Sequence, residues 1–270
     1  MTGALVLAER RGPVLLLTLN RPERLNAWTD ALEDEYFAHL RQAETDPDVR
    51  AVVVTGAGRG FSAGADMADL TRVTEEGSDA VSARERPPRT YPLTLRLPLV
   101  AAINGAAAGL GLVQALFCDL RFCAPEAKLT TSFARRGLVA EYGVAWLLPR
   151  MVGVSTALDL LMSGRVVRGE EARQLGLVDR VLPLDELVDG AVAYATDLAL
   201  HCSPRSMATI KEQVRRSLDQ GFGTAVAEAD ALMLESFDAP DVAEGVRSYL
   251  EKRPPDFAPL PGPAAGREDG

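Results

Sequence analysis

The sequence predicts an α/β fold that ends in a helical region. In the first half of the chain, strand-like apolar runs alternate with amphipathic helix patterns, as in sheets that are covered by helices. Two of the strand patterns run into turns of small residues, at 60–66 and at 104–111. From Val144 onward helix patterns dominate, separated by Gly and Pro. A chain of 270 residues can bury one large core and still carry a helical extension.

The N-terminal residues predict a hairpin and then a helix. Residues 4–8 and 14–19 have strand patterns, and a Gly-Pro turn separates them. An amphipathic helix is expected over 30–43, with Thr29 or Asp30 as its cap.

The middle of the chain predicts two strand–turn units. The strands cover 51–55 and 99–103, and each leads into one of the small-residue turns. After the second turn we expect a helix over 112–117 and a strand over 120–122. The stretch 67–92 is charged and contains Ser, Gly and Pro, so a mobile surface segment is expected there, and it would serve as a lid if it lies near the site.

The second half of the chain predicts helices and one more strand. The expected strand covers 178–181, helices cover 185–200 and 204–217, and two further helices lie between residues 221 and 252. The tail from Pro254 is rich in Pro, Gly and Ala, and we expect it to be disordered.

Composition excludes several classes of partner. The formal net charge of −9 argues against nucleic acid and anionic membranes as main partners. No apolar run is long enough to cross a bilayer, and residues 1–10 lack the order of a secretory signal. Cys118, Cys123 and Cys202 form no CxxC pair and suit reduced thiols. These features predict a cytoplasmic protein.

The small-residue turns point to backbone chemistry at the functional site. The two histidines, His39 and His201, lie far apart within helix patterns, so a Ser-His-Asp triad or a His-rich metal site is hard to build. A backbone that turns from strand to helix presents free N–H groups, and small residues let a ligand approach closely. Two such turns that meet would form a two-donor pocket for a developing oxyanion.

A nucleotide-binding oxidoreductase is a competing hypothesis. Residues 55–60 are similar to the glycine fingerprint of short-chain dehydrogenases. However, this segment follows a hairpin and a helix rather than the first strand, and 62–64 interrupt the expected start of the helix. The Tyr-x-x-x-Lys pair of that family also does not occur, because Tyr142 is followed four positions later by Trp146.

Several motifs in order carry a clear resemblance to one family. They are Asn20-Arg21-Pro22, Leu25-Asn26-Ala27, Phe61–Asp66, Ala102–Gly109, Gly137-Leu138-Val139, Leu148-Pro149-Arg150, Gly169–Ala172, Gly176–Val178 and Gly245–Arg253. Together they resemble the crotonase (enoyl-CoA hydratase/isomerase) superfamily, over roughly 5–257.

This resemblance implies an α/β fold of the crotonase type, a ββα superhelix with a C-terminal helical oligomerisation region. The acyl-CoA-binding core would cover 1–200, the helical region with subunit contacts 201–253, and the tail 254–270. Relatives form trimers or dimers of trimers, so a homotrimer or hexamer is expected. The substrate would be an acyl-CoA thioester, in which coenzyme A is part of the substrate, with no other cofactor and no metal.

The resemblance also implies the site residues. Two backbone amides, by motif position those of Ala65 and Leu110, would donate to the thioester carbonyl oxygen. Leu110 replaces the usual glycine, but a backbone donor survives if its φ stays negative. The residues expected to contact substrate or CoA are Arg24, Leu25, Ala27, Ala63, Gly64, Asp66, Gly109, Val113, Phe133, Tyr249 and Lys252. Arg24, Lys252 and Arg253 are the candidates for the CoA phosphates, Tyr249 for an aromatic of the CoA groove, and Asp66 also for a helix cap.

The residues at positions that match the catalytic residues of the superfamily favour isomerisation over hydration. Hydratases of this superfamily place two glutamates around a bound water, at the positions that Val113 and Phe133 occupy here. Glu141 instead matches the position at which peroxisomal-type enoyl-CoA isomerases and ring-modifying phenylacetyl-CoA isomerases carry Glu or Asp. One carboxylate suffices to move a proton from C2 to C4, and apolar neighbours such as Val113, Phe133 and Trp146 would raise its pKa. The structural alternative is that Glu141 caps the helix near Val144.

We therefore expect an enoyl-CoA isomerase with Glu141 as its proton shuttle. One alternative is hydratase or hydrolase activity through an unrecognised water site. Another is a weakly catalytic acyl-CoA binder in which Glu141 is structural. The two apolar residues at the hydratase positions favour a bulky or apolar acyl group.

Overall fold

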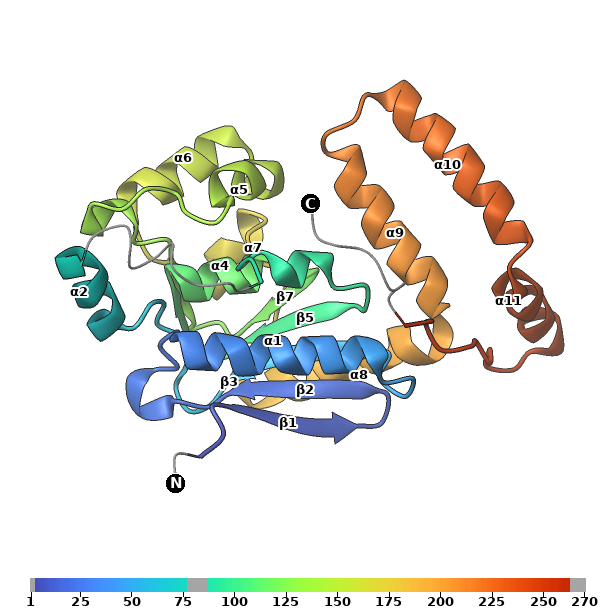
Figure 1. Cartoon of the computed structure of the whole chain (residues 1–270), viewed down its shortest axis with the longest axis horizontal. Helices are drawn as coiled ribbons and strands as arrows, with labels where there is room; N and C mark the ends of the chain where they lie inside the picture. The colour runs from blue at the N-terminus through green and yellow to red at the C-terminus, as the bar shows by residue number, and fades with distance from the viewer. Residues whose placement is uncertain (1–2, 77–86, 263–270) are drawn as a thin grey trace.

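The N-terminal hairpin forms one edge of a six-stranded sheet (Figure 1). The structure is a computed structural model, which describes residues 3–76 and 87–262. The strand order is β1-β2-β3-β5-β7-β10, and every neighbouring pair is parallel except the β1–β2 hairpin. The strands are β1 (Val6–Arg11), β2 (Val14–Leu19), β3 (Ala51–Gly56), β5 (Leu99–Ile103), β7 (Leu120–Cys123) and β10 (Arg180–Val181).

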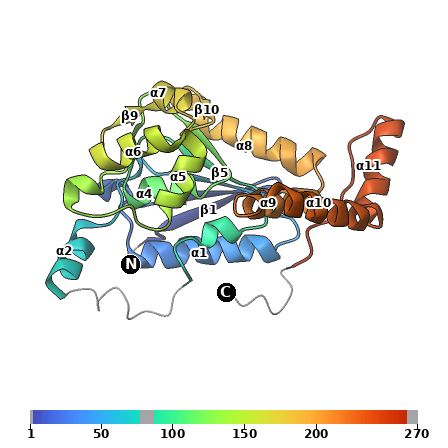
Figure 2. The same cartoon turned by 90° about the horizontal axis from the view of Figure 1, so that it is seen from above.

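Helices cover both faces of this sheet. All residues of β3 and β5 are buried, as expected of parallel strands between helical layers. Figure 2 shows α1 (Asp30–Thr45) and α8 (Leu184–His201) on opposite sides of the strands. The Thr29 Oγ1 accepts a hydrogen bond from the Leu32 amide over 3.3 Å, so the predicted N-terminal cap of α1 is confirmed.

A second, four-stranded sheet is formed by strands that follow those of the first sheet along the chain, and its order is β4-β6-β8-β9. Strand β3 continues into β4 and then α2, and β5 continues into β6 and then α4, so each unit repeats a ββα pattern. The elements are β4 (Gly60–Ser62), β6 (Ala106–Ala108), β8 (Lys128–Thr130), β9 (Val167–Arg168), α2 (Met67–Glu76) and α4 (Leu110–Leu116).

The remaining elements are mainly helical. They are η1 (Pro22–Arg24), η2 (Tyr91–Thr94), η3 (Ala134–Arg136), α5 (Val144–Val152), α6 (Val154–Ser163), α7 (Gly169–Gln174), α9 (Pro204–Ser217), α10 (Phe222–Phe237) and α11 (Pro240–Glu251). Within the described residues, no helix is both long and apolar enough to span a bilayer.

The structure corrects four predicted elements. The first strand covers Val6–Arg11 rather than 4–8, because Arg11 pairs with Val14 and leaves only two residues in the turn. Helix α4 begins at Leu110, directly after the glycine turn, rather than at 112. The first ten residues of the segment expected to be a lid form α2, and residues 77–86 of that segment lie outside the described residues. The last strand is limited to Arg180–Val181.

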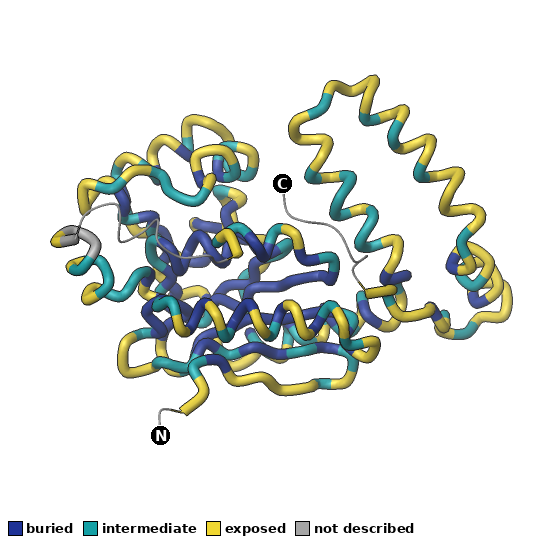
Figure 3. The backbone as a smooth tube through the Cα atoms, in the orientation of Figure 1, coloured by how far each residue is buried: buried dark blue, intermediate teal, exposed yellow. Residues whose placement is uncertain are grey.

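Helices α9, α10 and α11 extend away from the core as an arm (Figures 1 and 3). Lys211 anchors α9, because its Nζ donates to the Leu97 carbonyl and pairs with Asp119, both at 2.6 Å. No residue of α10 is buried. In the tail for which we expect disorder, residues 254–262 lie as irregular chain, with Phe257 buried and its carbonyl accepting a 2.8 Å hydrogen bond from Arg50.

Candidate active site

The two small-residue turns lie against each other. Gly64 has a φ of +90°, and an ideal Cβ placed on it would lie 2.5 Å from the Ala108 oxygen and 3.5 Å from the Leu110 nitrogen. A Cβ on Gly111 would likewise lie 2.4 Å from the Ser62 oxygen. Only glycine therefore permits this approach, and it brings Ala65 and Leu110 to one wall of a pocket.

The amides of Ala65 and Leu110 take no part in the hydrogen bonds of the described residues. Around Ala65, Trp28 donates to the Gly64 oxygen over 2.7 Å and Asp66 donates to the Trp28 oxygen over 3.0 Å, which leaves the amide between them unused. Leu110 is the first residue of α4, where an N–H has no partner within the helix. Its φ is not positive, as a backbone donor at this position requires.

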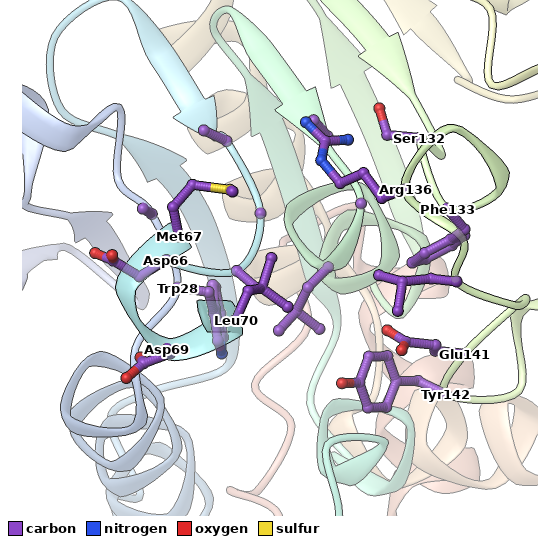
Figure 4. A pocket seen from close by; sticks show the side chains of 18 of the residues that line it. Trp28, Asp66, Met67, Asp69, Leu70, Ser132, Phe133, Arg136, Glu141 and Tyr142 are labelled. Carbon is purple, nitrogen blue, oxygen red and sulfur yellow. The ribbon is translucent and has the colours of Figure 1, made fainter. Parts of the chain in front are cut away.

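The cavity beside these amides has a volume of about 690 Å³. Figure 4 shows Met67 and Leu70 of α2 on one side, with Phe133, Glu141 and Tyr142 on the other. The wall combines apolar side chains such as Met67, Leu70 and Phe133 with several charged ones. An apolar chain and a charged group could thus both find partners in the cavity.

Glu141 lies on this wall in the turn before α5. Burial raises the pKa of its carboxyl, whereas the charge of Arg89 and a hydrogen bond from Tyr142 act to lower it. Its side chain does not cap α5: Gly143 is the N-cap and has no side-chain cap, and Val144 donates only to the Glu141 main-chain oxygen. The cap alternative is therefore not supported by the geometry.

Two other carboxylates at the cavity, those of Asp66 and Asp30, lie close to charged or polar groups. Asp66 Oδ1 accepts from the Ala68 amide over 3.1 Å, which confirms its predicted role at the start of α2, and its Oδ2 pairs with Arg21 at 3.0 Å. These two contacts outweigh burial and lower the pKa of Asp66. Asp30 lies 3.8 Å from an Arg89 nitrogen.

Four side chains that line the cavity form what we call the pocket network: Trp28, Glu33, Arg89 and Tyr142. Trp28 Nε1 and Arg89 Nε donate to Glu33 Oε2 over 2.8 and 2.9 Å, and Arg89 Nη1 donates to the Tyr142 hydroxyl over 2.5 Å. No role at the site was predicted for these residues, since Glu33 lies on the buried face of α1 and Arg89 in the charged stretch assigned to the surface.

Most of the predicted site residues come together at the cavity. Those that line it are Arg24, Ala27, Ala63, Gly64, Ala65, Asp66, Gly109, Leu110, Phe133 and Glu141. Arg136, which was not among the predicted site residues, also lines it.

Five predicted residues do not line this cavity within the chain, nor does Trp146. Val113 is buried in the core, and Leu25 packs against Gly60. Tyr249 and Lys252 lie at the end of the arm, away from the cavity, and Tyr249 is 83% exposed. Arg253 pairs with Glu244 and Glu251. Trp146 instead lies against the Arg150 guanidinium, whose carbon is 3.9 Å from the centre of the ring.

A comparison with known families decides which group of proteins this site belongs to. The model of the enoyl-CoA hydratase/isomerase family matches residues 9–259. The chain belongs to the enoyl-CoA hydratase/isomerase family. The motif-based resemblance is thereby confirmed, and the dehydrogenase hypothesis is dropped.

Relatives in this family carry both hydratase and isomerase names. The chain is 40% identical to a Thermus thermophilus protein named "Putative enoyl-CoA hydratase", over 92% of this chain and 98% of that protein. It is 36% identical to the 1,2-epoxyphenylacetyl-CoA isomerase of Escherichia coli, over 90% of this chain and 94% of the isomerase.

The fold matches solved members of the family. The enoyl-CoA hydratase of Polaromonas sp. JS666 superimposes with a TM-score of 0.88 at 28% identity, covering 93% of this chain and 99% of that structure. The predicted crotonase-type α/β fold with C-terminal helices is therefore confirmed.

Proposed function

We propose that this enzyme isomerises the double bond of an enoyl-CoA, with Glu141 as the single proton carrier. The observation that carries this proposal is the position of Glu141: it lines the same cavity as Ala65 and Leu110, and burial raises the pKa of its carboxyl. The hydratase positions hold Val113, which is buried in the core, and Phe133, which is part of the wall.

The geometry supports a two-step proton transfer. The thioester oxygen of a 3-enoyl-CoA would accept hydrogen bonds from the Ala65 and Leu110 amides. Ionised Glu141 removes a proton from C2, and the negative charge of the dienolate rests on that oxygen. The protonated Glu141 then returns the proton at C4, which yields the 2-enoyl-CoA. A raised pKa suits a group that must both accept and donate the proton. Arg24, at the cavity, would contact the CoA phosphates.

An absorbance assay tests the proposal. A 3-enoyl-CoA that becomes conjugated gains ultraviolet absorbance at the thioester, whereas hydration of a 2-enoyl-CoA removes it. We expect the first substrate to turn over and the second to react far more slowly. A rapid loss of absorbance with the 2-enoyl-CoA and none gained with the 3-enoyl-CoA would show a hydratase instead.

Hydratase activity remains the second candidate, because several relatives bear that name. It would need a water site without the usual two glutamates. Hydrolase activity would release a free CoA thiol, and a weakly catalytic binder would retain acyl-CoA without converting either substrate.

We also propose that the arm of α9–α11 mediates assembly into a homotrimer or hexamer. Phe222, Leu234 and Phe237 of α10 are 86, 63 and 62% exposed, more apolar surface than an isolated helix normally presents to water.

A charge placed on α10 is expected to disrupt this assembly. Phe237→Lys would put an ammonium into the apolar contact, whereas Glu235→Lys changes an exposed polar residue of the same helix. Analytical ultracentrifugation should give a multiple of the 28.9 kDa chain for the unchanged protein and for Glu235→Lys, and smaller species for Phe237→Lys. A single-chain mass for the unchanged protein would contradict the proposal.

A further inference from the structure

The pocket network begins at the segment that carries one of the proposed oxyanion donors. Trp28 pairs with the chain on both sides of Ala65 through its main-chain N–H and C=O. Its indole N–H then donates to Glu33, whose side chain is only 3% exposed. A buried carboxylate that accepts hydrogen bonds from Trp28 and from Arg89, the second of which is also an ion pair, is a rigid anchor.

Arg89 connects this anchor to the turn that carries Glu141. Its Nε and Nη1 reach Glu33 and Tyr142, and its main-chain oxygen accepts a 3.1 Å hydrogen bond from the Gln114 side chain on α4. The guanidinium also lies over the Tyr142 ring, 5.1 Å from its centroid. Arg89 is therefore held from both its main chain and its side chain.

The direction of the Arg89–Tyr142 hydrogen bond leaves the hydroxyl proton available. A guanidinium can only donate, so the Tyr142 oxygen accepts and its own O–H must donate elsewhere. The carboxylate of the preceding residue, Glu141, lines the same cavity, and the Tyr142 hydroxyl acts to lower its pKa. Figure 4 shows the two side chains next to each other at the cavity.

The backbone of this turn is held in an uncommon conformation. Tyr142 has a φ of +54°, and Gly143 follows with +75°. A bulky residue rarely adopts the left-handed region, and such conformations persist where surrounding contacts hold them.

We propose that Tyr142 and Arg89 are positioning residues for Glu141, which hold its carboxylate at a fixed place relative to the Ala65 and Leu110 amides. This inference rests on the proposed function, in which Glu141 carries the proton. The pocket network connects the segment that carries Ala65 to the turn that carries Glu141 through four side chains. A thioester whose oxygen is bound by the Ala65 amide would therefore present its C2 to Glu141.

Tyr142→Phe is the principal test, since it removes the hydroxyl and keeps the ring. With a 3-enoyl-CoA, we expect kcat to fall about tenfold, because a hydrogen bond to a charged group is lost, while KM changes little. The acid limb of kcat/KM should move to higher pH: Glu141 must be ionised to act as base, and the hydroxyl that lowers its pKa is gone.

The charged and titratable groups that surround Glu141 at the cavity stay the same in this variant. They are Asp30, Glu33, Arg89, Arg24, Asp66, Asp69, Arg72 and Arg136, all of which line the cavity. A shift of the pH profile can therefore be assigned to the missing hydroxyl.

Arg89→Lys is a second variant, which keeps the positive charge but cannot span Glu33 and Tyr142 with a planar fork. It should lower kcat as Tyr142→Phe does, with a smaller movement of the acid limb. Tyr194→Phe is the matched control, because Tyr194 also lies beside an arginine, with Arg180 4.5 Å from its ring, but does not line the cavity. It should match the unchanged enzyme.

The outcomes separate this inference from the proposed function. If Glu141→Gln abolishes isomerisation while Tyr142→Phe keeps the kcat and pH profile of the unchanged enzyme, the positioning role is wrong and the function stands. A fall in kcat with an unmoved pH profile and a lowered Tm would show a merely structural contact and also overturn it. If Glu141→Gln itself keeps full activity, the proposed function fails first.

Discussion

Glu141→Gln is expected to reduce the kcat of isomerisation by about 10²- to 10⁴-fold, the usual contribution of a positioned acid–base group. The amide has nearly the same shape as the carboxyl but cannot accept the C2 proton. Binding of the CoA thioester should stay nearly unchanged, because its oxygen would be held by the backbone amides of Ala65 and Leu110. Stopped-flow or steady-state absorbance with a 3-enoyl-CoA, together with a Kd from calorimetry, measures both quantities.

Glu126→Gln is the control for this substitution, since the Glu126 side chain is 87% exposed and pairs with Arg168 at the surface. It should leave kcat and Tm unchanged. Full activity in Glu141→Gln would show that another group moves the proton.

Glu141→Gln should also be more stable toward unfolding than the unchanged enzyme at neutral pH. Burial raises the folded-state pKa of Glu141 above its unfolded value, so the favourable contribution of the protonated form is present below the unfolded pKa and is lost as pH rises through the folded pKa. Glutamine does not ionise, so the free energy of unfolding of Glu141→Gln is not lowered in this way at neutral pH. The Tm of Glu141→Gln should exceed that of the unchanged enzyme at pH 7, and the difference should vanish below about pH 4, where ordinary carboxyls are protonated. A lower Tm at pH 7 would contradict this account.

Gly64→Ala is expected to have the second large effect. The new Cβ would lie 2.5 Å from the Ala108 oxygen, a main-chain atom that cannot rotate away, and the φ of +90° is unfavourable for alanine. The two turns must separate, which moves one proposed donor from the thioester oxygen. We expect kcat to fall by about 10²- to 10³-fold, as for the loss of one oxyanion donor, and the free energy of unfolding to fall by about 1–3 kcal/mol.

Gly12→Ala separates the steric effect from the effect of φ. Gly12 has a φ of +59° in the N-terminal hairpin, but a Cβ there would meet no atom within 4 Å. Its activity should remain, with a loss of stability of about 1 kcal/mol in chemical denaturation. Equal losses of activity in both variants would show that the contact between the turns is not needed.

The glycine turns and the core strands could be predicted because their signals are local. The buried runs of β3 and β5 follow from continuous apolar sequence, and the small residues after them follow from the need for close backbone contact. Phe133 and Glu141 were assigned to the site through motif position, and the structure places both at the cavity.

The parts that could not be predicted depend on distant contacts. Arg89 lies in a charged stretch, and only the folded chain brings it to Glu33, which is 56 positions away in sequence. Val113 comes soon after the second turn, yet it is buried in the core together with all the other residues of α4. Tyr249 and Lys252 lie on the arm, so their predicted contact with CoA cannot be made within their own chain and would need an adjacent copy.

The arm and the sheet are expected to differ in the rate at which their amide hydrogens exchange. Strands β3 and β5 are buried along their whole length and pair in parallel with their neighbours, so their amides exchange their hydrogens only when much of the core unfolds. Helix α10 has no buried residue, and its amides in an isolated chain would exchange through small local openings. Deuterium uptake that is fast in α10 at low protein concentration and slows on concentration would thus report the covering of that helix directly.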